Sequence, residues 1–241
     1  MVGLSAVACA FAAAAFISFG DAASSDGHFM VQVQYDDGNG GKSLCNGALV
    51  TKSHVATLAS CASGDISKTT VFSGTALLWK TGKNGTAHAV KTFKKHPKFS
   101  LKNAATIQYY FDVAVFKLQK PVSTGAQVST IELGAVGSLP AVGKNVRLAG
   151  FGTYDFSKDI TNKLRLRVVQ IQDKAACGKQ FGVTIPSDEF CTVGDPDNGK
   201  SGTSVFANDK LYGLMSWGSK VFVDVTNPEI NSFIKEQIKS L

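Results

Sequence analysis

Short runs of apolar and β-branched residues alternate with clusters of Gly, Asp, Asn, Ser and Lys along most of the chain. Runs of this length, bounded by turn-forming residues, are typical of β-strands. Their regular spacing predicts an all-β sandwich or barrel rather than alternating strands and helices. The predicted strands are Met30–Tyr35, Gly47–Leu58, Thr70–Phe72, Ala87–Phe93, Val113–Leu118, Asn145–Leu148, Leu164–Gln172, Val205–Phe206, Leu211–Met215 and Val221–Val225.

The last segment of the chain has the period of a helix. Asn227 is a good N-cap, Pro228 suits the first helical position, and Glu229 suits the positive end of the helix dipole. A single apolar stripe follows, which predicts a helix over residues 228–239 that packs on the preceding domain. The residues of this stripe are Ile230, Phe233, Ile234 and Ile238. The polar segment Lys120–Gln127 is the best candidate for a linker between two halves of the chain.

The N-terminal segment is apolar and differs from the rest. Residues 2–19 carry no charge and are rich in Ala, Val, Leu, Ile and Phe, with small residues near position 20. This pattern predicts a secretory signal peptide over residues 1–20, with a mature chain of residues 21–241 and no membrane association after its removal. The alternative is a single N-terminal membrane span, for which the segment is short.

Composition narrows the class of protein. The chain has 241 residues, of which 44% are hydrophobic, and it carries a formal net charge of +7. These values fit an ordered globular protein whose basic surface favours an acidic glycan, an acidic protein or anionic lipid, or only maintains solubility. The densest basic cluster has no nucleic-acid-binding motif, and the sequence predicts neither a metal site nor a cofactor. That cluster consists of Lys91, Lys94, Lys95, His96 and Lys98.

The cysteine count agrees with secretion. Cys9 lies within the predicted signal peptide, which leaves four cysteines in the mature chain, Cys45, Cys61, Cys177 and Cys191. An even number suits disulfides formed in an oxidising, extracellular compartment. Asn84 begins the sequon Asn84-Gly85-Thr86 and is a candidate glycosylation site, although short sequons also occur by chance.

Several motifs occur in the order typical of one enzyme family. They are Ser43–Val50 followed by Val55–Cys61, Phe111–Leu118, Gly150-Phe151-Gly152, Gly199-Lys200-Ser201-Gly202 and Ser216-Trp217-Gly218. The chain therefore resembles the trypsin/chymotrypsin family of serine proteases over nearly all of its mature length. The resemblance implies two six-stranded antiparallel β-barrels, about 28–120 and about 127–226, with a C-terminal helix. It also implies the disulfides Cys45–Cys61 and Cys177–Cys191, whose spacings of 16 and 14 positions match the family.

The same resemblance identifies a defect in the catalytic triad. The family uses a Ser nucleophile, a His general base and an Asp that orients the His. Asp112 and Ser201 stand at two of these positions, but Ser60 stands where the family has its histidine. A hydroxyl group cannot act as a general base near neutral pH, and removing this base from such enzymes costs on the order of 10⁶-fold in kcat.

No other residue is expected to replace the base. His54 lies six residues before Ser60, about 20 Å away along a strand, and His96 precedes Pro97 in a predicted surface loop. Lys200 adjoins Ser201, which raises the alternative of a Ser–Lys dyad. In this family, however, the residue before the nucleophile points away from the cleft.

Further substitutions affect activation and specificity. The family has an aspartate at the position of Lys200, and it pairs there with a new N-terminus to order the oxyanion hole, here Gly199 and Ser201. Asp195 stands where a trypsin-like pocket has its acidic base, and it either retains a preference for basic residues or, as we favour, is a surface acid on a shortened loop. The strand Ser216-Trp217-Gly218, which pairs with substrate in the family, is followed closely by Val221.

These observations predict a secreted, non-catalytic serine protease homologue that binds rather than cleaves. Its expected partner is a protein, for example a host glucanase or other secreted hydrolase, as for the glucanase inhibitor proteins of plant-pathogenic oomycetes. One alternative is a weak or unconventional serine endopeptidase that uses Ser201, helped by a histidine of the substrate. The other alternative is a secreted polyanion-binding protein that acts through its positive charge.

Overall fold

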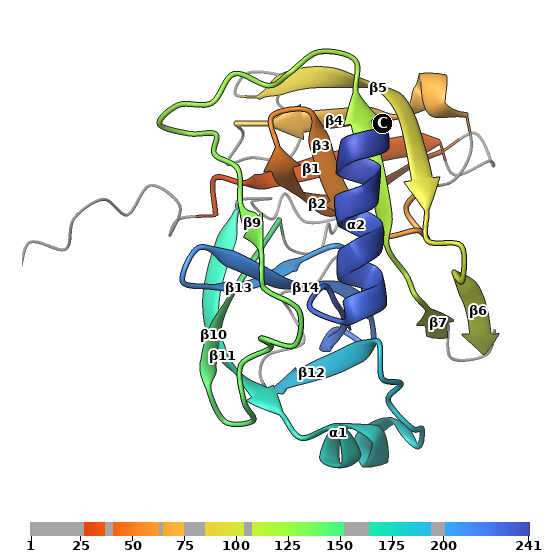
Figure 1. The fold of residues 1–241 in the computed structure, drawn as a ribbon, viewed down its shortest axis with the longest axis vertical. Coiled ribbons are helices and arrows are strands. Elements are labelled where there is room, and N and C mark those ends of the chain that lie inside the picture. Colours follow the sequence, from red (N-terminus) through yellow and green to blue (C-terminus); the bar gives the residue numbers. More distant parts are fainter. Residues whose placement is uncertain are drawn as a thin grey trace, which may run out of the picture.

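The computed structural model describes residues 27–36, 41–62, 65–74, 85–103, 108–151, 164–193 and 201–241. Two closed six-stranded antiparallel β-barrels and a C-terminal helix make up most of the protein, as the sequence predicts (Figure 1). The predicted signal peptide and Asn84 lie outside the described residues. Within the described residues, every helix is too short or too polar to cross a membrane.

The first barrel closes in the order β1-β2-β3-β8-β5-β4. Its strands are β1 (Met30–Asp36), β2 (Lys42–Thr51), β3 (His54–Thr57), β4 (Thr70–Ser73), β5 (Thr86–Lys95) and β8 (Ala114–Leu118). The sequence predicts one strand over Gly47–Leu58, and this prediction is wrong, because the chain reverses at Lys52 and Ser53 so that Ala48 pairs with Ala56. The turn contains no Gly or Pro and therefore gives no strong sequence signal.

The second barrel contains β10 (Asn145–Gly150), β11 (Arg165–Gln172), β12 (Glu189–Val193), β13 (Ser204–Ala207), β14 (Lys210–Trp217) and β15 (Val221–Asp224). It closes through the pairing of β13 with β14. A short strand, β9 (Glu132–Leu133), adds to β14 in parallel. The sequence pattern misses both β9 and β12.

Additional short elements lie outside the barrels. The hairpin of β6 (Ser100–Asn103) and β7 (Gln108–Tyr110) extends from the first barrel, and a 3₁₀ turn spans Ile66–Lys68. The helix α1 (Lys174–Phe181) is absent from the sequence prediction. Its capping residues were available as signals, because Asp173 accepts a hydrogen bond from the Ala176 amide and Gly182 adopts the left-handed conformation that ends many helices.

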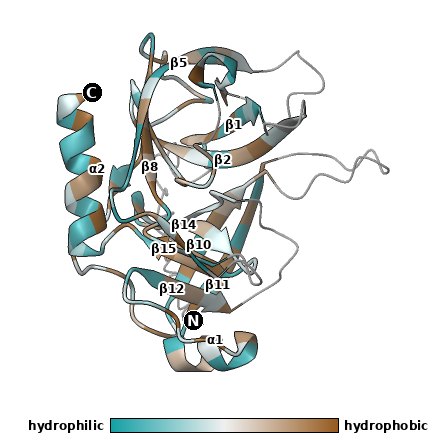
Figure 2. Cartoon of the chain, turned by 90° about the vertical axis from the view of Figure 1, so that its right-hand side faces the viewer, coloured by the Kyte–Doolittle hydropathy of each residue, from teal (hydrophilic) through white to brown (hydrophobic). Residues whose placement is uncertain are grey.

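The C-terminal helix α2 (Pro228–Ser240) forms as predicted, one residue longer. The Asn227 side chain accepts hydrogen bonds from the amides of Glu229 and Ile230. The helix lies along one side of the molecule and has both hydrophobic and hydrophilic residues along its length (Figure 2). Its buried residues Ile230, Phe233 and Ile234 join a core cluster that contains residues of both barrels, so the helix packs against both.

Candidate functional site

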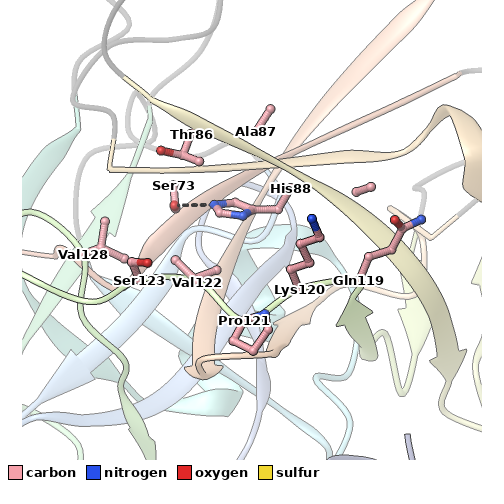
Figure 3. Close-up of a pocket in the computed structure, with 11 residues that line it drawn as sticks. Ser73, Thr86, Ala87, His88, Gln119, Lys120, Pro121, Val122, Ser123 and Val128 are labelled. Atoms are coloured by element: carbon pink, nitrogen blue, oxygen red, sulfur yellow. Dashed lines mark hydrogen bonds between the residues drawn. The ribbon is translucent and has the colours of Figure 1, made fainter.

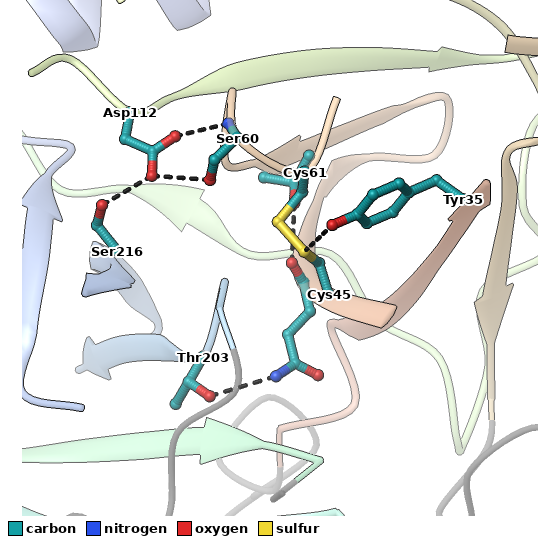
Figure 4. The surroundings of a disulfide bond; sticks show 9 residues. Tyr35, Cys45, Ser60, Cys61, Asp112, Thr203 and Ser216 are labelled. Carbon is teal, nitrogen blue, oxygen red and sulfur yellow. Dashed lines mark hydrogen bonds between the residues drawn. A yellow bond between two sulfur atoms is a disulfide. The ribbon is translucent and has the colours of Figure 1, made fainter. Parts of the chain in front are cut away.

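The side chain of Asp112 is the centre of a buried polar cluster between the two barrels. One carboxylate oxygen, Oδ1, accepts the Ser60 amide at 2.8 Å. The other, Oδ2, accepts the Ser60 hydroxyl at 3.0 Å and the Ser216 hydroxyl at 2.7 Å (Figure 4). Asp112 lies two residues before β8, Ser60 follows β3, and Ser216 lies near the end of β14. The fold therefore joins three residues that are up to 156 positions apart in the sequence.

The electrostatics of this cluster follow from its burial. Asp112 is 1% exposed, and this desolvation raises the pKa of its carboxyl group. Hydrogen bonds from Ser60, Ser216 and the Ala59 backbone oppose the shift, because they favour the charged form. Both oxygens of the carboxylate thus have donors supplied by the protein itself.

Ser201 lies in a turn just before β13, and its backbone is attached to the first barrel. The Ser201 carbonyl accepts a hydrogen bond from the Asn46 amide at 2.7 Å, and Asn46 Nδ2 donates to Thr203 Oγ1 at 3.3 Å. Gly202 has a φ of +84°, and a Cβ at that position would lie 1.9 Å from the Asn46 carbonyl oxygen. A glycine is therefore required next to Ser201 by both conformation and space. Among the described residues, none forms a hydrogen bond with the Ser201 hydroxyl.

Next to this cluster, Trp217 at the end of β14 is hydrogen-bonded to a buried acid, Glu189. The Trp217 indole Nε1 donates to Glu189 Oε1 at 2.7 Å, while Glu189 Oε2 has no hydrogen-bond partner among the described residues. Burial, together with the nearby carboxylates of Asp188 and Asp112, raises the pKa of Glu189 to about 8. Phe181 of α1 packs edge-on against Trp217 at 5.2 Å between ring centroids.

A second acid connects the barrels next to Asp112. The Phe111 amide donates to Asp188 Oδ2 at 2.7 Å. Phe111 has a φ of +48°, in the left-handed region that costs a non-glycine residue roughly 1–2 kcal/mol. Its ring stacks on His96 at 4.6 Å, which helps to hold this conformation. Sequence reasoning missed Glu189 and Asp188, because the strand that they precede or begin was not predicted.

The four histidines all lie within the described residues. His54 is buried and contacts Thr51 at 2.7 Å and Lys117 at 3.2 Å, and burial together with the Lys117 charge lowers its pKa. His88 contacts the Ser73 hydroxyl at 2.8 Å, and His28 Nδ1 has no partner. In the part of the chain that the structure describes, no imidazole is hydrogen-bonded to Ser60, Asp112 or Ser201.

The prediction that His96 lies on a surface loop is wrong. His96 is 3% exposed and packs between Phe111 and Phe233 of α2. The residues around it, Pro97 and Lys98, are exposed, so the sequence pattern is that of a loop while the imidazole itself is covered by the helix.

The remaining predicted site residues divide into two groups. Asp195, Gly199 and Lys200 lie outside the described residues. The disulfides Cys45–Cys61 and Cys177–Cys191 are both present, and the first fixes the turn that contains Ser60. Among the described residues, no group of His, Cys, Asp or Glu is arranged to hold a metal ion.

A separate pocket of about 460 Å³ lies on the first barrel, away from the Asp112 cluster (Figure 3). Both polar side chains and apolar ones such as Val122 and Val128 line it, and the imidazole of His88 is hydrogen-bonded to Ser73 within it. No residue of the Asp112 cluster contributes to this pocket. The polar residues that line it include Ser73, Thr86, His88, Gln119, Lys120 and Ser123.

Known structures share this fold. The scabies mite inactivated protease paralogue S-I1 has a TM-score of 0.74 and 20% identity, with coverage of 90% of this chain and 97% of that one. Kallikrein-related peptidase 10 in complex with Zn²⁺ has a TM-score of 0.69 and 20% identity, with coverage of 90% and 98%. At these identities the likeness concerns the fold alone.

Sequence comparison gives the family. The chain is 28% identical to a trypsin of Sarcophaga bullata over 215 residues, which cover 82% of this chain and 80% of the relative. It is 29% identical to trypsin-3 of Homo sapiens over 187 residues, which cover 75% and 58%. The family model for trypsin matches residues 17–234. Because this match covers most of the sequence and the fold consists of two β-barrels, the chain belongs to the trypsin family.

Proposed function

We propose that this protein is a secreted, non-catalytic member of the trypsin family that binds another protein. The observation that carries the proposal is the pair of hydrogen bonds from Ser60, through its amide and its hydroxyl, to the two oxygens of Asp112. In an active protease of this family, the imidazole of the catalytic histidine donates a hydrogen bond to this carboxylate. Here a serine hydroxyl donates that bond to the carboxylate instead, and within the described residues no imidazole is hydrogen-bonded to Ser201.

The chemistry of acyl transfer explains why this matters. The serine hydroxyl must lose its proton as it attacks, and the base must have a pKa near the working pH to accept it. The Ser60 hydroxyl is not such a base. Asp112 is buried, and its lone pairs already accept hydrogen bonds from Ser60 and Ser216. Loss of the base is expected to reduce kcat on the order of 10⁶-fold relative to an intact triad.

Binding suits the parts of the molecule that remain. Loops held on a rigid pair of barrels present a stable surface to a partner, whether or not the cleft is catalytic. Structures named as inactivated protease paralogues share the fold, so the fold does not depend on catalysis. The resemblance to glucanase inhibitor proteins leads us to propose a secreted hydrolase, such as a glucanase, as the partner.

Covalent labelling tests the non-catalytic proposal. The protein and the variant Ser201→Ala are treated with a fluorophosphonate probe, with bovine trypsin as a positive control. We expect no labelling of Ser201 above that of the variant under conditions in which trypsin is labelled completely. Stoichiometric labelling that Ser201→Ala abolishes would instead support the weak serine hydrolase.

A second assay tests the proposed partner. Purified endo-β-glucanase is titrated with the protein, and hydrolysis of its glucan is followed. Saturable inhibition by both the wild-type protein and Ser201→Ala is the expected result, because inhibition by binding requires no nucleophile. If the glucanase retains full activity at micromolar protein, glucanases are not the partner.

A further inference from the structure

Positive charge is concentrated in the first barrel. Residues 28–120 contain twelve lysines, four aspartates and neither arginine nor glutamate, which gives a net charge of +8. Residues 121–241 contain thirteen basic and twelve acidic residues, a net charge of +1. Among the four aspartates of the first segment, Asp112 is buried and Asp36 is paired with Lys68. A basic field therefore covers one half of the molecule rather than the whole surface.

The fold gathers several of these lysines at the end of β8. Three backbone hydrogen bonds join this end to its neighbours, from Leu118 to Ser53, from Gln119 to Ala89 and from Val122 to Lys52. They bring together Lys52 of the β2–β3 turn, Lys91 of β5 and Lys120, all of which are exposed.

Two more lysines lie on the paired strands β5 and β8. Lys94 pairs with Val115 and Lys117 pairs with Thr92, so Lys94 and Lys117 are diagonal neighbours on the same face of β5 and β8. In the described part of the chain, no carboxylate forms an ion pair with any lysine of this set. We call it the basic patch, and its members are Lys52, Lys91, Lys94, Lys117 and Lys120.

The pocket of the first barrel adjoins this patch, because Lys120 belongs to both (Figure 3). Its wall presents the hydroxyls of Thr86 and Ser123 and the amide of Gln119. Burial lowers the pKa of His88, so its imidazole is neutral at pH 7 and acts as a hydrogen-bonding group rather than a cation. Hydroxyl, amide and neutral imidazole groups are suited to a ligand with many hydroxyls.

We propose that the basic patch and the adjoining pocket form a binding site for an acidic polysaccharide. One sugar residue occupies the pocket, and acidic groups on the neighbouring residues contact the lysines. Lysine supplies mobile point charges without the bidentate geometry of arginine, which suits a flexible chain with distributed anionic groups. This site is separate from the Asp112 cluster, and the inference holds whether or not Ser201 is catalytic.

Other polyanions fit these observations less well. The described exposed large hydrophobic residues lie outside the patch, so it offers no apolar group for insertion into a membrane. Among the residues that line the adjoining pocket, His88 alone has an aromatic ring, whereas single-stranded nucleic acid is usually held by stacking on several aromatic rings. The disulfides indicate an oxidising compartment, in which acidic polysaccharides are accessible polyanions.

Binding is tested with oligogalacturonate as the probe, by calorimetry over a series of NaCl concentrations. The triple variant K52Q/K91Q/K120Q removes three exposed patch lysines, and K144Q/R167Q/K179Q removes three exposed basic residues on or next to the second barrel as a control with equal net charge. At about 1 kcal/mol for each lysine, we expect the patch variant to lose on the order of 100-fold in affinity. The control should change less than about 3-fold, because screening confines the effect of a charge to about 10 Å. Equal losses in both variants would overturn a localised site, as would no binding at low salt.

A pocket variant distinguishes a polysaccharide from other polyanions. Ser123→Trp fills the pocket without changing the charge, and Ser123 is exposed, so folding is preserved. We expect this variant to weaken oligogalacturonate and to leave the weaker binding of poly-L-glutamate unchanged. Preferential binding of poly-L-glutamate or of phosphatidylserine vesicles by the wild-type protein would show that the site serves an acidic protein or a membrane and would overturn the proposal.

Discussion

Replacement of Glu189 by glutamine should change how the stability of this protein depends on pH. The carboxyl group of Glu189 is 1% exposed, has one hydrogen-bond donor in Trp217, and has an oxygen, Oε2, with no partner. These conditions disfavour the charged form and raise the pKa from 4.5 to about 8. Between these two pH values the folded protein holds a proton that the unfolded chain has released.

The sign and size of the effect follow from proton linkage. Because the folded state binds the extra proton, the free energy of unfolding falls as pH rises from 4.5 to 8, by about 1.4 kcal/mol for each pH unit, and it is constant above 8 for this group. The whole window corresponds to about 5 kcal/mol, a large part of the 5–15 kcal/mol that is typical of a folded domain. Glutamine retains the acceptor for Trp217 and does not titrate.

Urea unfolding at pH 5, 6, 7 and 8, followed by circular dichroism, measures the difference between the wild-type protein and Glu189→Gln. Relative to wild type, the variant should gain stability steadily with pH. Asp112 and Asp224 also have raised pKa values, and those of His54, His88 and His96 are lowered. Asp112 interacts with Glu189, but a protonated Glu189 is neutral, as glutamine is, so below pH 8 these groups contribute equally to both proteins.

The matched control is Glu132→Gln, which removes an exposed carboxyl group paired with Lys210. This ion pair lowers the pKa of Glu132, so its linkage lies below pH 4.5 and the difference between control and wild type should be flat from pH 5 to 8. Parallel stability curves for Glu189→Gln and wild type would refute the assignment of a protonated carboxyl beneath Trp217.

Three further changes test the Asp112 cluster and the Ser201 turn. Ser60→Ala removes the hydroxyl donor from a buried carboxylate and should lower the free energy of unfolding by about 1–3 kcal/mol in urea, whereas no change would mean that water replaces the hydroxyl. Gly202→Ala places a methyl group against the Asn46 carbonyl and should lower the free energy of unfolding in urea by at least about 2 kcal/mol. An unchanged free energy would show that the turn is free to move. Ser60→His restores an imidazole but should give little peptidase activity on fluorogenic peptides, because Lys200 and the short loop after Gly218 remain. Appreciable turnover would show that the missing base is the main defect.

The sequence alone predicted the class of fold and most of its strands. Short runs of apolar and β-branched residues bounded by turn-forming residues identify β1, β4, β5 and β15 closely. The terminal helix is likewise encoded locally, by Asn227, Pro228 and a stripe of isoleucine and phenylalanine. The spacing of the cysteines, read through the family resemblance, gave both disulfides.

The local sequence pattern did not predict burial where the side chains that cover a residue come from distant segments. The strand β12 begins with Glu189, an unusual residue for a core strand, and its place is explained only by Trp217, 28 positions later. His96 lies in a polar stretch, and α2 covers it from the other end of the chain. In both cases burial depends on a partner that the neighbouring sequence does not contain.

The candidate site shows the same division. The sequence by itself determined which residues are available: a serine where the family has its histidine, an aspartate, a second serine and many lysines in the first half. Only the tertiary structure decided that both donors of Ser60 satisfy Asp112 and that Lys52, Lys91 and Lys120 converge. The physical reason is that closing a barrel pairs strands far apart in sequence, so the charges and hydrogen bonds around a group are set by topology rather than by its neighbours along the chain.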